Sequence, residues 1–320
     1  MSSYQSSKID YLMSIHIKKL MTVSVPISFR QMRLFMALAD TGSVTAAARA
    51  CHVTQPTASM QLREITDAVG VPLYEVISRR VHLTDAGQDL ARTARLIADE
   101  WEAFGQRVNA VKGLARGRLK VAVVSTAKYF VPRLLGTFCA RFPDIDIALE
   151  VLNRDGVLAR LRDNLDDLYI MSMPPTDIDI EDQVFMPNPL VVIAASSHPL
   201  AARRRLSLDD LARLRFILRE PGSGTRMAVD AHFKRHHFKP DVRLALGSNE
   251  AIREAVAANL GLAVVSRHAL PAKPADDGVA VLKVTGFPVE SNWHVVHRKG
   301  KQLSPIATVF KAHLLALRDC

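Results

Sequence analysis

The chain has 320 residues, of which 48 % are apolar and 23 % are charged, and its formal net charge is +10 at neutral pH. This length and composition exclude a fibrous or disordered chain and indicate a globular protein of two or three domains. There are 13 basic and 10 acidic residues through Lys112, against 29 and 22 after it, so the excess is spread along the chain. The charge favours an anionic partner but does not locate a nucleic-acid-binding domain.

The chain has three widely spaced cysteines, none of them in a CxxC motif: Cys51, Cys139 and Cys320. This pattern indicates a reduced, cytoplasmic protein without a disulfide framework or a zinc site. No apolar run is long enough to span a membrane, and Lys18 and Lys19 interrupt the only candidate signal segment. We therefore expect no membrane partner and a disordered tail over residues 1–28, in which Met13 and Met21 are alternative starts.

Three short helices are predicted after this tail. The first covers residues 30–41, and Ser43 is suited to cap a second helix over residues 44–51. Thr54 caps the third helix, where Pro56 falls in the first turn and costs no hydrogen bond. Apolar residues of the third helix recur at helical spacing at Ala58, Leu62, Ile65 and Val69.

A hairpin and a long helix are predicted next. Residues 71–84 carry spaced apolar residues around an Arg-Arg turn, which indicates a small β-hairpin. The helix over residues 85–112 connects two domains, a position typical of a linker and often of a dimer seam. Its apolar stripe, expected to pair with a second subunit, comprises Leu90, Ala94, Ile97, Trp101 and Phe104.

From residue 114 onward strands and helices alternate, which is typical of α/β layers. The expected strands are residues 119–124, 146–151, 168–171, 190–194, 216–218, 262–265, 279–284 and 293–297. The expected helices are residues 131–141, 156–164, 207–214, 227–236 and 249–259. The predicted organisation is therefore a tail over 1–28, a first domain over 29–87, a linker over 88–113 and a second domain over 114–320.

The order of helix, tight turn, helix and Arg-tipped hairpin outlines a winged helix-turn-helix, whose third helix presents its N-terminal end to the major groove. Gln55 at that end is able to pair with adenine. Arg63 is expected to reach the DNA backbone, and Arg79 and Arg80 stand where a wing touches the minor groove. A helical hairpin with ordinary caps would show much of the same pattern. The candidate DNA-binding residues are Thr54, Gln55, Pro56, Thr57, Ser59, Met60, Arg63, Arg79 and Arg80.

The ordered string over residues 41–87 resembles the DNA-binding domain of LysR-type transcription regulators almost position by position. The matching motif residues are Ser43, Thr45, Ala47, Ala48, Gln55, Pro56, Ser59, Leu83, Thr84, Ala86 and Gly87. Three positions depart from the family pattern. Met60 and Val76 stand where basic residues are frequent, which removes potential phosphate contacts. Cys51 replaces a buried leucine and is expected to be a small core residue rather than a redox sensor.

The second domain resembles the LysR-type effector domain, which is similar to periplasmic solute-binding proteins. The resemblance implies an α+β / α/β protein with a winged helix-turn-helix, a long linker helix and a two-lobed effector domain. We expect lobe I over residues 117–174 and 269–320, and lobe II over residues 175–268. The proline-rich segment at Met173-Pro174-Pro175 and the segment after Arg267 are the expected crossings between the lobes.

Ligands of open α/β sheets bind at the carboxyl ends of strands, near helix N-termini. The loops over residues 125–128, 219–226 and 247–250 are placed in this way. In the second loop Thr225 and Arg226 are expected to direct a hydroxyl and a guanidinium at an anion, although a plain connecting loop is the alternative. The candidate effector-binding residues are Ser125, Thr126, Lys128, Arg154, Arg219, Glu220, Gly222, Ser223, Gly224, Thr225, Arg226, Ser248 and Asn249.

The strings STAKYFVPRLL, REPGSGTR and SNEAIREAVAANLGLAVVS, which begin at Ser125, Arg219 and Ser248, resemble CbbR-type regulators of carbon-fixation operons. The resemblance implies a small anionic or phosphorylated metabolite as effector and no cofactor. LysR-type regulators of other operons, for sulfur, nitrogen or amino-acid metabolism, share REPGSGTR and remain an alternative. The family also implies that the protein binds a pseudo-palindromic site on promoter DNA. It implies a homodimer formed through the linker helix, a homotetramer built from such dimers, and a possible contact with RNA polymerase.

An enzyme is the main rival from another class, but the sequence lacks a nucleophile elbow, a Walker loop, a dinucleotide fingerprint and an HExxH helix. His232 and His236 share a helical face near His237, yet this neighbourhood offers too few ligands for a metal, and a solvated basic helix is the expectation. A ligand-binding protein without DNA regulation and an architectural DNA binder are further rivals. Footprinting with and without candidate effectors separates these classes.

Overall fold

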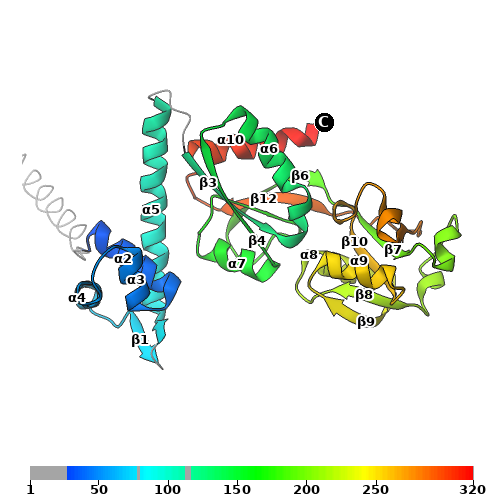
Figure 1. Cartoon of the computed structure of the whole chain (residues 1–320), viewed down its shortest axis with the longest axis horizontal. Helices are drawn as coiled ribbons and strands as arrows, with labels where there is room; N and C mark the ends of the chain where they lie inside the picture. Colours follow the sequence, from blue (N-terminus) through cyan, green and yellow to red (C-terminus); the bar gives the residue numbers. More distant parts are fainter. Residues whose placement is uncertain (1–26, 78–79, 112–116, 320) are drawn as a thin grey trace, which may run out of the picture. The chain divides into compact units, whose positions relative to one another are not determined.

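The computed structural model describes residues 27–77, 80–111 and 117–319, which form two compact units divided between Ala98 and Asp99 (Figure 1). Almost all of the expected tail, together with Arg79 of the expected wing, lies outside these residues. The long helix α5 (Asp85–Val111) contributes its beginning to the first unit and its end to the second.

The first unit is built on three helices that follow the sequence prediction closely. They are α2 (Phe29–Thr41), α3 (Val44–Ala50) and α4 (Gln55–Val69). Hydroxyl side chains of Ser28, Ser43 and Thr54 cap their N-termini by accepting a backbone N–H. Gly42 and Gly70 end α2 and α4 in the left-handed conformation, with φ of 62° and 79°, which glycine adopts without strain.

One small core holds these helices together. Its fully buried side chains include Leu34, Phe35, Leu38, Leu62, Ile65 and Leu73. Cys51 is half-buried and packs against this core. The hairpin of β1 (Tyr74–Ile77) and β2 (Arg80–Leu83) follows, and α5 begins directly behind it. A Cβ at Gly87 would lie 1.9 Å from the carbonyl oxygen of Leu73, so only glycine allows the first turn of α5 to pack here.

The apolar stripe expected along the linker helix does not all face outward. Ala94 is buried and Leu90 packs against the core of the first unit, because the start of α5 completes that core. Further along the helix, Ile97, Trp101 and Phe104 are 40 %, 65 % and 50 % exposed. The stripe available to a second subunit therefore begins at Ile97 rather than at Leu90.

The second unit contains two five-stranded sheets (Figure 1). The first sheet has the order β4-β3-β5-β12-β6 and is packed against α6 (Val131–Arg141), α7 (Arg154–Arg162) and α10 (Pro305–Leu315). Its strands are β3 (Gly117–Val124), β4 (Ile145–Leu152), β5 (Leu168–Met171), β6 (Ile180–Pro187) and β12 (Asn292–Arg298). The parallel order β4-β3-β5 brings the carboxyl ends of these strands to one edge.

The second sheet has the order β11-β7-β10-β8-β9. Its strands are β7 (Leu190–Ala195), β8 (Arg215–Arg219), β9 (Asp241–Leu246), β10 (Leu262–Ser266) and β11 (Val279–Val281). Helix α8 (Gly224–Arg235) packs on one face through Val229 and Phe233, and α9 (Asn249–Ala257) packs on the other through Ile252 and Val256. Both helices begin at the carboxyl ends of parallel strands, which is where ligands of such sheets bind.

The crossings between the two sheets differ from the expected ones. Because β6 pairs with β12 in the first sheet, the chain first crosses at residues 188–189 and returns at residues 289–291, not at Met173-Pro174-Pro175 or after Arg267. Lobe I is therefore residues 117–187 and 292–319, and lobe II is the segment between them. The prolines at 174 and 175 lie in a loop that precedes β6.

Several elements were absent from the sequence prediction or shorter than predicted. Strand β6, strand β9 and helix α10 were not predicted, and the helix expected over residues 207–214 is only the short 3-10 turn Asp209–Leu211. Strand β6 has one buried residue, Phe185, and shows no apolar alternation, whereas β9 alternates at Val242, Leu244 and Leu246 but is exposed over most of its length.

Candidate functional site

The first candidate site is the exposed N-terminal end of α4. Its opposite face is anchored in the core by Ala58, Leu62 and Ile65, which leaves the first turn on the surface. Thr54 and Thr57 share a hydroxyl–hydroxyl hydrogen bond of 2.8 Å, and the Gln55 amide nitrogen donates to the Ser59 hydroxyl at 3.0 Å. Pro56 is exposed beside them. The arrangement presents an amide and three hydroxyls in one short row, which suits base-edge and phosphate contacts.

Two further candidates lie near this end. Arg63 is exposed and only 3.9 Å from Asp67 on the same helix, a weak surface pair that leaves its guanidinium available. Arg80 begins β2 and is exposed, whereas Arg79 lies outside the described residues. Met60 is 55 % exposed, so its side chain adds apolar surface where a basic residue would add charge.

The second candidate site lies between the two lobes and centres on Arg219 at the end of β8. Its side chain is only 3 % exposed, and all of its N–H groups find acceptors. Two bonds of 2.7 and 2.8 Å go to the Glu220 carboxylate in the same lobe. Others reach the Ser125 and Thr126 hydroxyls in lobe I at 3.3 and 3.1 Å, and the Asn249 amide oxygen at 3.3 Å. A buried charge is stable only when paired in this way.

Asn249 and Thr126 complete the buried cluster. The Asn249 amide nitrogen donates to the Thr126 hydroxyl oxygen at 3.1 Å, and both residues are almost fully buried. Asn249 is the first residue of α9, which Ser248 caps, and Thr126 lies in the 3-10 turn Ser125–Tyr129 directly after β3. Two strand ends from different lobes thus meet at one hydroxyl.

A second group of bonds joins the lobes beside this cluster. The Glu250 carboxylate accepts from the Tyr129 hydroxyl at 2.6 Å, from the Lys128 Nζ at 2.9 Å and from the Ser248 hydroxyl at 2.7 Å. Burial acts to raise the pKa of Glu250, but these donors outweigh it and lower the pKa to about 2. Burial and the carboxylate raise the pKa of Tyr129. The pair therefore stays a carboxylate and a neutral phenol at neutral pH.

The space enclosed between the lobes is small, about 10 Å³. It is lined by Val124, Ser125, Thr126, Arg154, Ser172, Arg219, Ser223, Gly224 and Thr225. This volume holds about one water, so the cluster is closed around its own side chains. A Cβ at Gly224 would lie 2.7 Å from the Ser172 hydroxyl oxygen, so glycine is needed for α8 to approach lobe I.

Arg154 is the one cationic group of this cavity with an unsatisfied donor. It begins α7, its Nη2 donates to the Met173 carbonyl at 3.0 Å, and its Nε is buried without a partner among the described residues. Burial lowers the pKa of Arg154 below its ordinary value. A buried donor that lacks a partner is costly, and an anion in the cavity would satisfy it.

Most of the expected effector residues lie at or beside the interlobe cavity, but the side chains of Arg226 and Lys128 do not line it. Arg226 does not line the cavity, because its Nε binds Asp230 at 2.8–2.9 Å and its Nη1 donates to the Arg219 carbonyl at 3.0 Å. Lys128 is held by Glu250 at the rim. Gly222 supports the turn before α8 with φ of 85°. Ser172 lines the cavity although the sequence did not single it out, because nothing in its β5 context marks a site.

Among the described residues, no group of three or more His, Cys, Asp or Glu side chains could hold a metal ion. His232 and His236 do lie together, with ring centroids 4.5 Å apart, but no third ligand joins them there. Within the same part of the chain, no helix is both long and apolar enough to cross a membrane.

Two family descriptions together match nearly all of the chain after its first 28 residues. "Bacterial regulatory helix-turn-helix protein, lysR family" matches residues 29–88, and "LysR substrate binding domain" matches residues 112–318. The chain belongs to the LysR family. This regulator is 43 % identical to the HTH-type transcriptional activator CmpR of Synechocystis sp. over 90 % of this chain and 95 % of that protein. It is 41 % identical to the RuBisCO operon transcriptional regulator of Acidithiobacillus ferrooxidans over 90 % and 94 % of the two chains.

Solved structures agree with this assignment. The regulatory domain of CcmR from Synechocystis PCC6803, solved in complex with 2-PG, is 46 % identical with a TM-score of 0.61, covering 63 % of this regulator and 98 % of that chain. Full-length CbnR, solved in complex with its target DNA, is 26 % identical with a TM-score of 0.65, covering 91 % and 99 %. The expected architecture of a helix-turn-helix followed by a two-lobed effector domain is confirmed. The chain is a LysR-type transcription regulator with DNA-binding and effector-binding domains.

Proposed function

We propose that this regulator binds a small phosphorylated carboxylate of the 2-phosphoglycolate class between its lobes and thereby controls genes of inorganic-carbon assimilation. The observation that carries the proposal is the buried, unpartnered Nε of Arg154 at the interlobe cavity. Helix α8 begins at the same cavity, where Ser223, Gly224 and Thr225 are part of the lining. Free backbone N–H groups and a guanidinium are the donors that phosphate and carboxylate oxygens prefer.

The relatives support the same class of ligand and target. The CcmR regulatory domain was solved with 2-PG, and several relatives are named as RuBisCO operon or CbbR regulators. LysR-type regulators of sulfur, nitrogen or amino-acid operons are the alternative, and a different effector would distinguish them. The DNA-binding residues proposed are those of the α4 end, with Arg63 on the DNA backbone and Arg80 of the wing at the minor groove.

Binding requires the interlobe site to rearrange. A cavity of about 10 Å³ cannot hold 2-phosphoglycolate, so the bonds that Arg219 and Glu250 make across the lobes have to lengthen or exchange for bonds to the ligand. A ligand shifts such an equilibrium only by its differential affinity for the two arrangements. We propose that the rearrangement changes how a dimer, or a tetramer, places its helix-turn-helix domains on a pseudo-palindromic promoter site.

Calorimetry with the full-length protein tests the effector directly. We expect 2-phosphoglycolate to bind more tightly than glycolate or inorganic phosphate, because only it carries both anionic groups. Arg154→Gln should weaken binding about ten-fold or more, as expected when a charge-assisted hydrogen bond is lost. Arg162→Gln is the matched control, since Arg162 lies on the same helix but pairs with Asp177 at the surface.

Footprinting at the promoter next to the gene completes the test. Protection that changes on addition of 2-phosphoglycolate in wild type, but not in Arg154→Gln, supports the proposal. If Arg154→Gln and Arg162→Gln bind the ligand equally well, the interlobe site is wrong. If only sulfur, nitrogen or amino-acid metabolites change the footprint, the carbon-assimilation role is wrong while the family assignment stands.

A further inference from the structure

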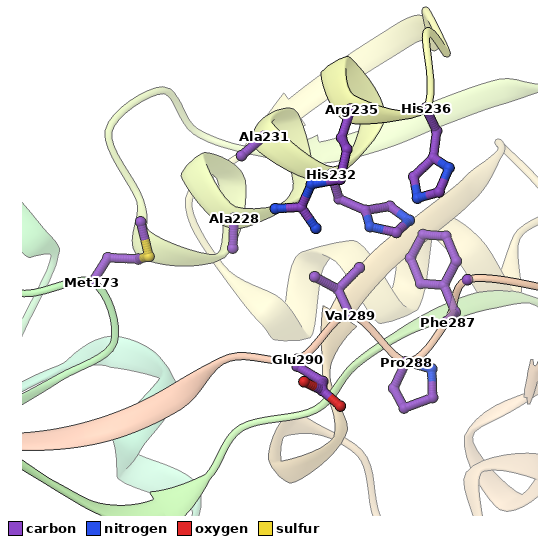
Figure 2. A pocket seen from close by; sticks show the side chains of 11 residues that line it. Met173, Ala228, Ala231, His232, Arg235, His236, Phe287, Pro288, Val289 and Glu290 are labelled. Atoms are coloured by element: carbon purple, nitrogen blue, oxygen red, sulfur yellow. The ribbon is translucent and has the colours of Figure 1, made fainter.

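A second and much larger cavity, of about 610 Å³, lies beside the crossing between the lobes (Figure 2). Its walls come from the C-terminal half of α8, from the returning segment at residues 286–290 and from Met173 in lobe I. The interlobe cluster described above shares none of these residues. The volume is in the range of small-molecule sites.

The polar groups of this cavity lack partners. His232 is only 6 % exposed, yet its Nε2 is buried without a hydrogen-bond partner among the described residues. Arg235, the last residue of α8, is exposed and forms no hydrogen bond or ion pair within the described chain. Figure 2 shows both side chains, with His236, directed from α8 toward the returning segment. Burial, and after it the neighbouring His236 and Arg235, lowers the pKa of His232, so its ring is neutral at neutral pH and Arg235 supplies the positive charge of this corner.

The remaining wall is apolar. Phe287 packs edge-on against the His232 ring with centroids 4.7 Å apart, and Pro288 and Val289 extend the same wall. Met173 and the alanines of α8 close the other side. Glu290 is the one carboxylate of the lining and offsets the charge of Arg235, so a phosphate dianion would be disfavoured there. The chemistry fits a molecule with one carboxylate and an apolar body.

We propose that this cavity, defined by His232, Arg235, Phe287 and Met173, is a second effector site that binds a small monocarboxylate with an apolar or aromatic body. The carboxylate lies against Arg235 and the histidines, and the apolar body lies against Phe287, Pro288 and Met173. Charge-assisted bonds to a guanidinium supply orientation, and burial of the apolar body supplies affinity.

The second site is connected to the first by helix α8 and by the bend at Ser172 and Met173. Helix α8 lines the interlobe cavity with its N-terminal residues and the second cavity with Ala228, Ala231, His232 and Arg235. Ser172 lines the first cavity and its neighbour Met173 the second, and the Met173 carbonyl accepts from Arg154 at 3.0 Å. A ligand that fixes α8 and Met173 therefore changes the affinity of the interlobe site, and the coupling acts equally in both directions.

Calorimetry of the full-length protein with phenylacetate, hexanoate and the neutral phenylacetamide tests the site. Both carboxylates should bind saturably, and phenylacetamide at least about ten-fold more weakly, because the charge-assisted bond is lost. Arg235→Gln should weaken phenylacetate binding by a similar factor. Lys234→Gln, on the adjacent exposed position outside the cavity, should leave it within about two-fold. Equal loss in the two variants, or no saturable binding at millimolar concentration, overturns the proposal.

Coupling is tested by titrating 2-phosphoglycolate at increasing fixed phenylacetate. We expect the affinity to change and then reach a plateau about five-fold or more from its starting value, the lower end of the coupling typical of two linked sites. Mutual displacement without a plateau would place both ligands in one site and overturn the proposal. This coupling rests on the proposed function, whereas phenylacetate binding and its loss in Arg235→Gln do not. A protein that binds phenylacetate but not 2-phosphoglycolate therefore refutes the first proposal alone.

Discussion

The guanidinium of Arg219 in lobe II donates to the hydroxyl of Thr126 in lobe I, with Nη1 and Oγ1 3.1 Å apart and both residues buried. The same hydroxyl accepts from the Asn249 amide at 3.1 Å. One oxygen therefore satisfies two donors that start from different strand ends. Its removal leaves both donors buried and short of an acceptor, a cost that the hydrogen-bond energies allow us to estimate.

Thr126→Val keeps the shape of the side chain and removes this oxygen. We expect the free energy of unfolding of the effector domain to fall by about 1–3 kcal/mol, the cost of leaving buried donors unsatisfied. Thr308→Val is the matched control, because the exposed Thr308 hydroxyl donates at 3.1 Å to the Ser304 carbonyl, one turn earlier on its own helix. Its effect should stay within about 0.5 kcal/mol. Urea unfolding followed by circular dichroism measures both, and equal losses would contradict the interlobe role of Thr126.

The lowered pKa of Glu250 predicts an acid-dependent contact between the lobes. Burial opposes the shift, but bonds from Tyr129, Ser248 and Lys128 lower the pKa to about 2 in the folded protein, against 4.5 unperturbed. A carboxyl with a depressed folded pKa stabilises the fold above its unfolded pKa and loses that contribution as the pH falls through the folded value. The contribution of Glu250 is therefore constant above about pH 5 and declines between about 4.5 and 2.

Melting temperatures of wild type and Glu250→Gln, measured by calorimetry from pH 7 downward, test this. The wild type should melt higher at pH 7, and the difference should shrink below about pH 4.5 as the carboxylate is protonated. Because the side chain is 42 % exposed, solvent screening keeps the effect modest. A difference that grows on acidification would contradict the sign of the shift. Glu254→Gln on the same helix, whose side chain has no such donors in the interlobe site, is the control.

The local pattern was sufficient for the helix-turn-helix and for the strand ends that carry the effector residues. Hydroxyl caps at Ser43 and Thr54 mark the starts of α3 and α4, and Gly42 and Gly70 mark the ends of α2 and α4, since these signals act within a few residues. The elements that the sequence did not predict depend on pairing between strands that are far apart in the chain. Strand β6 belongs to lobe I only because it pairs with β12, more than a hundred residues later, so the crossings were misplaced. Periodicity within a segment cannot reveal such a partner.

The directions of the effector-domain side chains could not be predicted from the sequence either. The string Thr225-Arg226 was expected to present a guanidinium to the cleft, but Asp230 lies one turn further on the same helix and binds Arg226 there. Arg219, seven residues earlier, takes the buried central position instead, because it ends a buried strand that faces lobe I. The larger cavity at His232 was missed because its other wall, Phe287 to Glu290, is more than fifty residues away.

Gln55 is predicted to read a base edge. It is exposed at the first position of α4, and the Ser59 hydroxyl holds its amide at 3.0 Å, which orients the side chain before DNA is bound. Gln55→Ala should weaken binding to the specific site by about 1–3 kcal/mol, the discrimination typical of a bidentate contact. Binding to a random duplex at low salt should barely change. Fluorescence anisotropy with both duplexes measures this, and Gln61→Ala, further along the same helix, is the control. Equal loss on both duplexes would refute base reading by Gln55.

The exposed apolar side chains of α5 predict a subunit seam. Ile97, Trp101 and Phe104 recur at helical spacing, and the rings of Trp101 and Phe104 lie 5.7 Å apart. An exposed apolar row on a linker helix is stabilised when an identical row covers it in a two-fold dimer. Ile97→Asp would then place an unpaired carboxylate in the seam and shift the protein toward monomers.

Light scattering coupled to size exclusion measures the oligomer of this variant. Leu96→Asp makes the same substitution one residue away, about 100° around the helix, and should leave the assembly intact. Circular dichroism confirms that both variants fold, since Ile97 is 40 % exposed in the single chain and an aspartate there meets solvent. Ile97→Asp should also lose affinity for a promoter fragment with two half-sites far more than for a fragment with one, because only the dimer binds both at once. An oligomer that is unchanged in Ile97→Asp, or disrupted equally in Leu96→Asp, places the subunit interface on another surface.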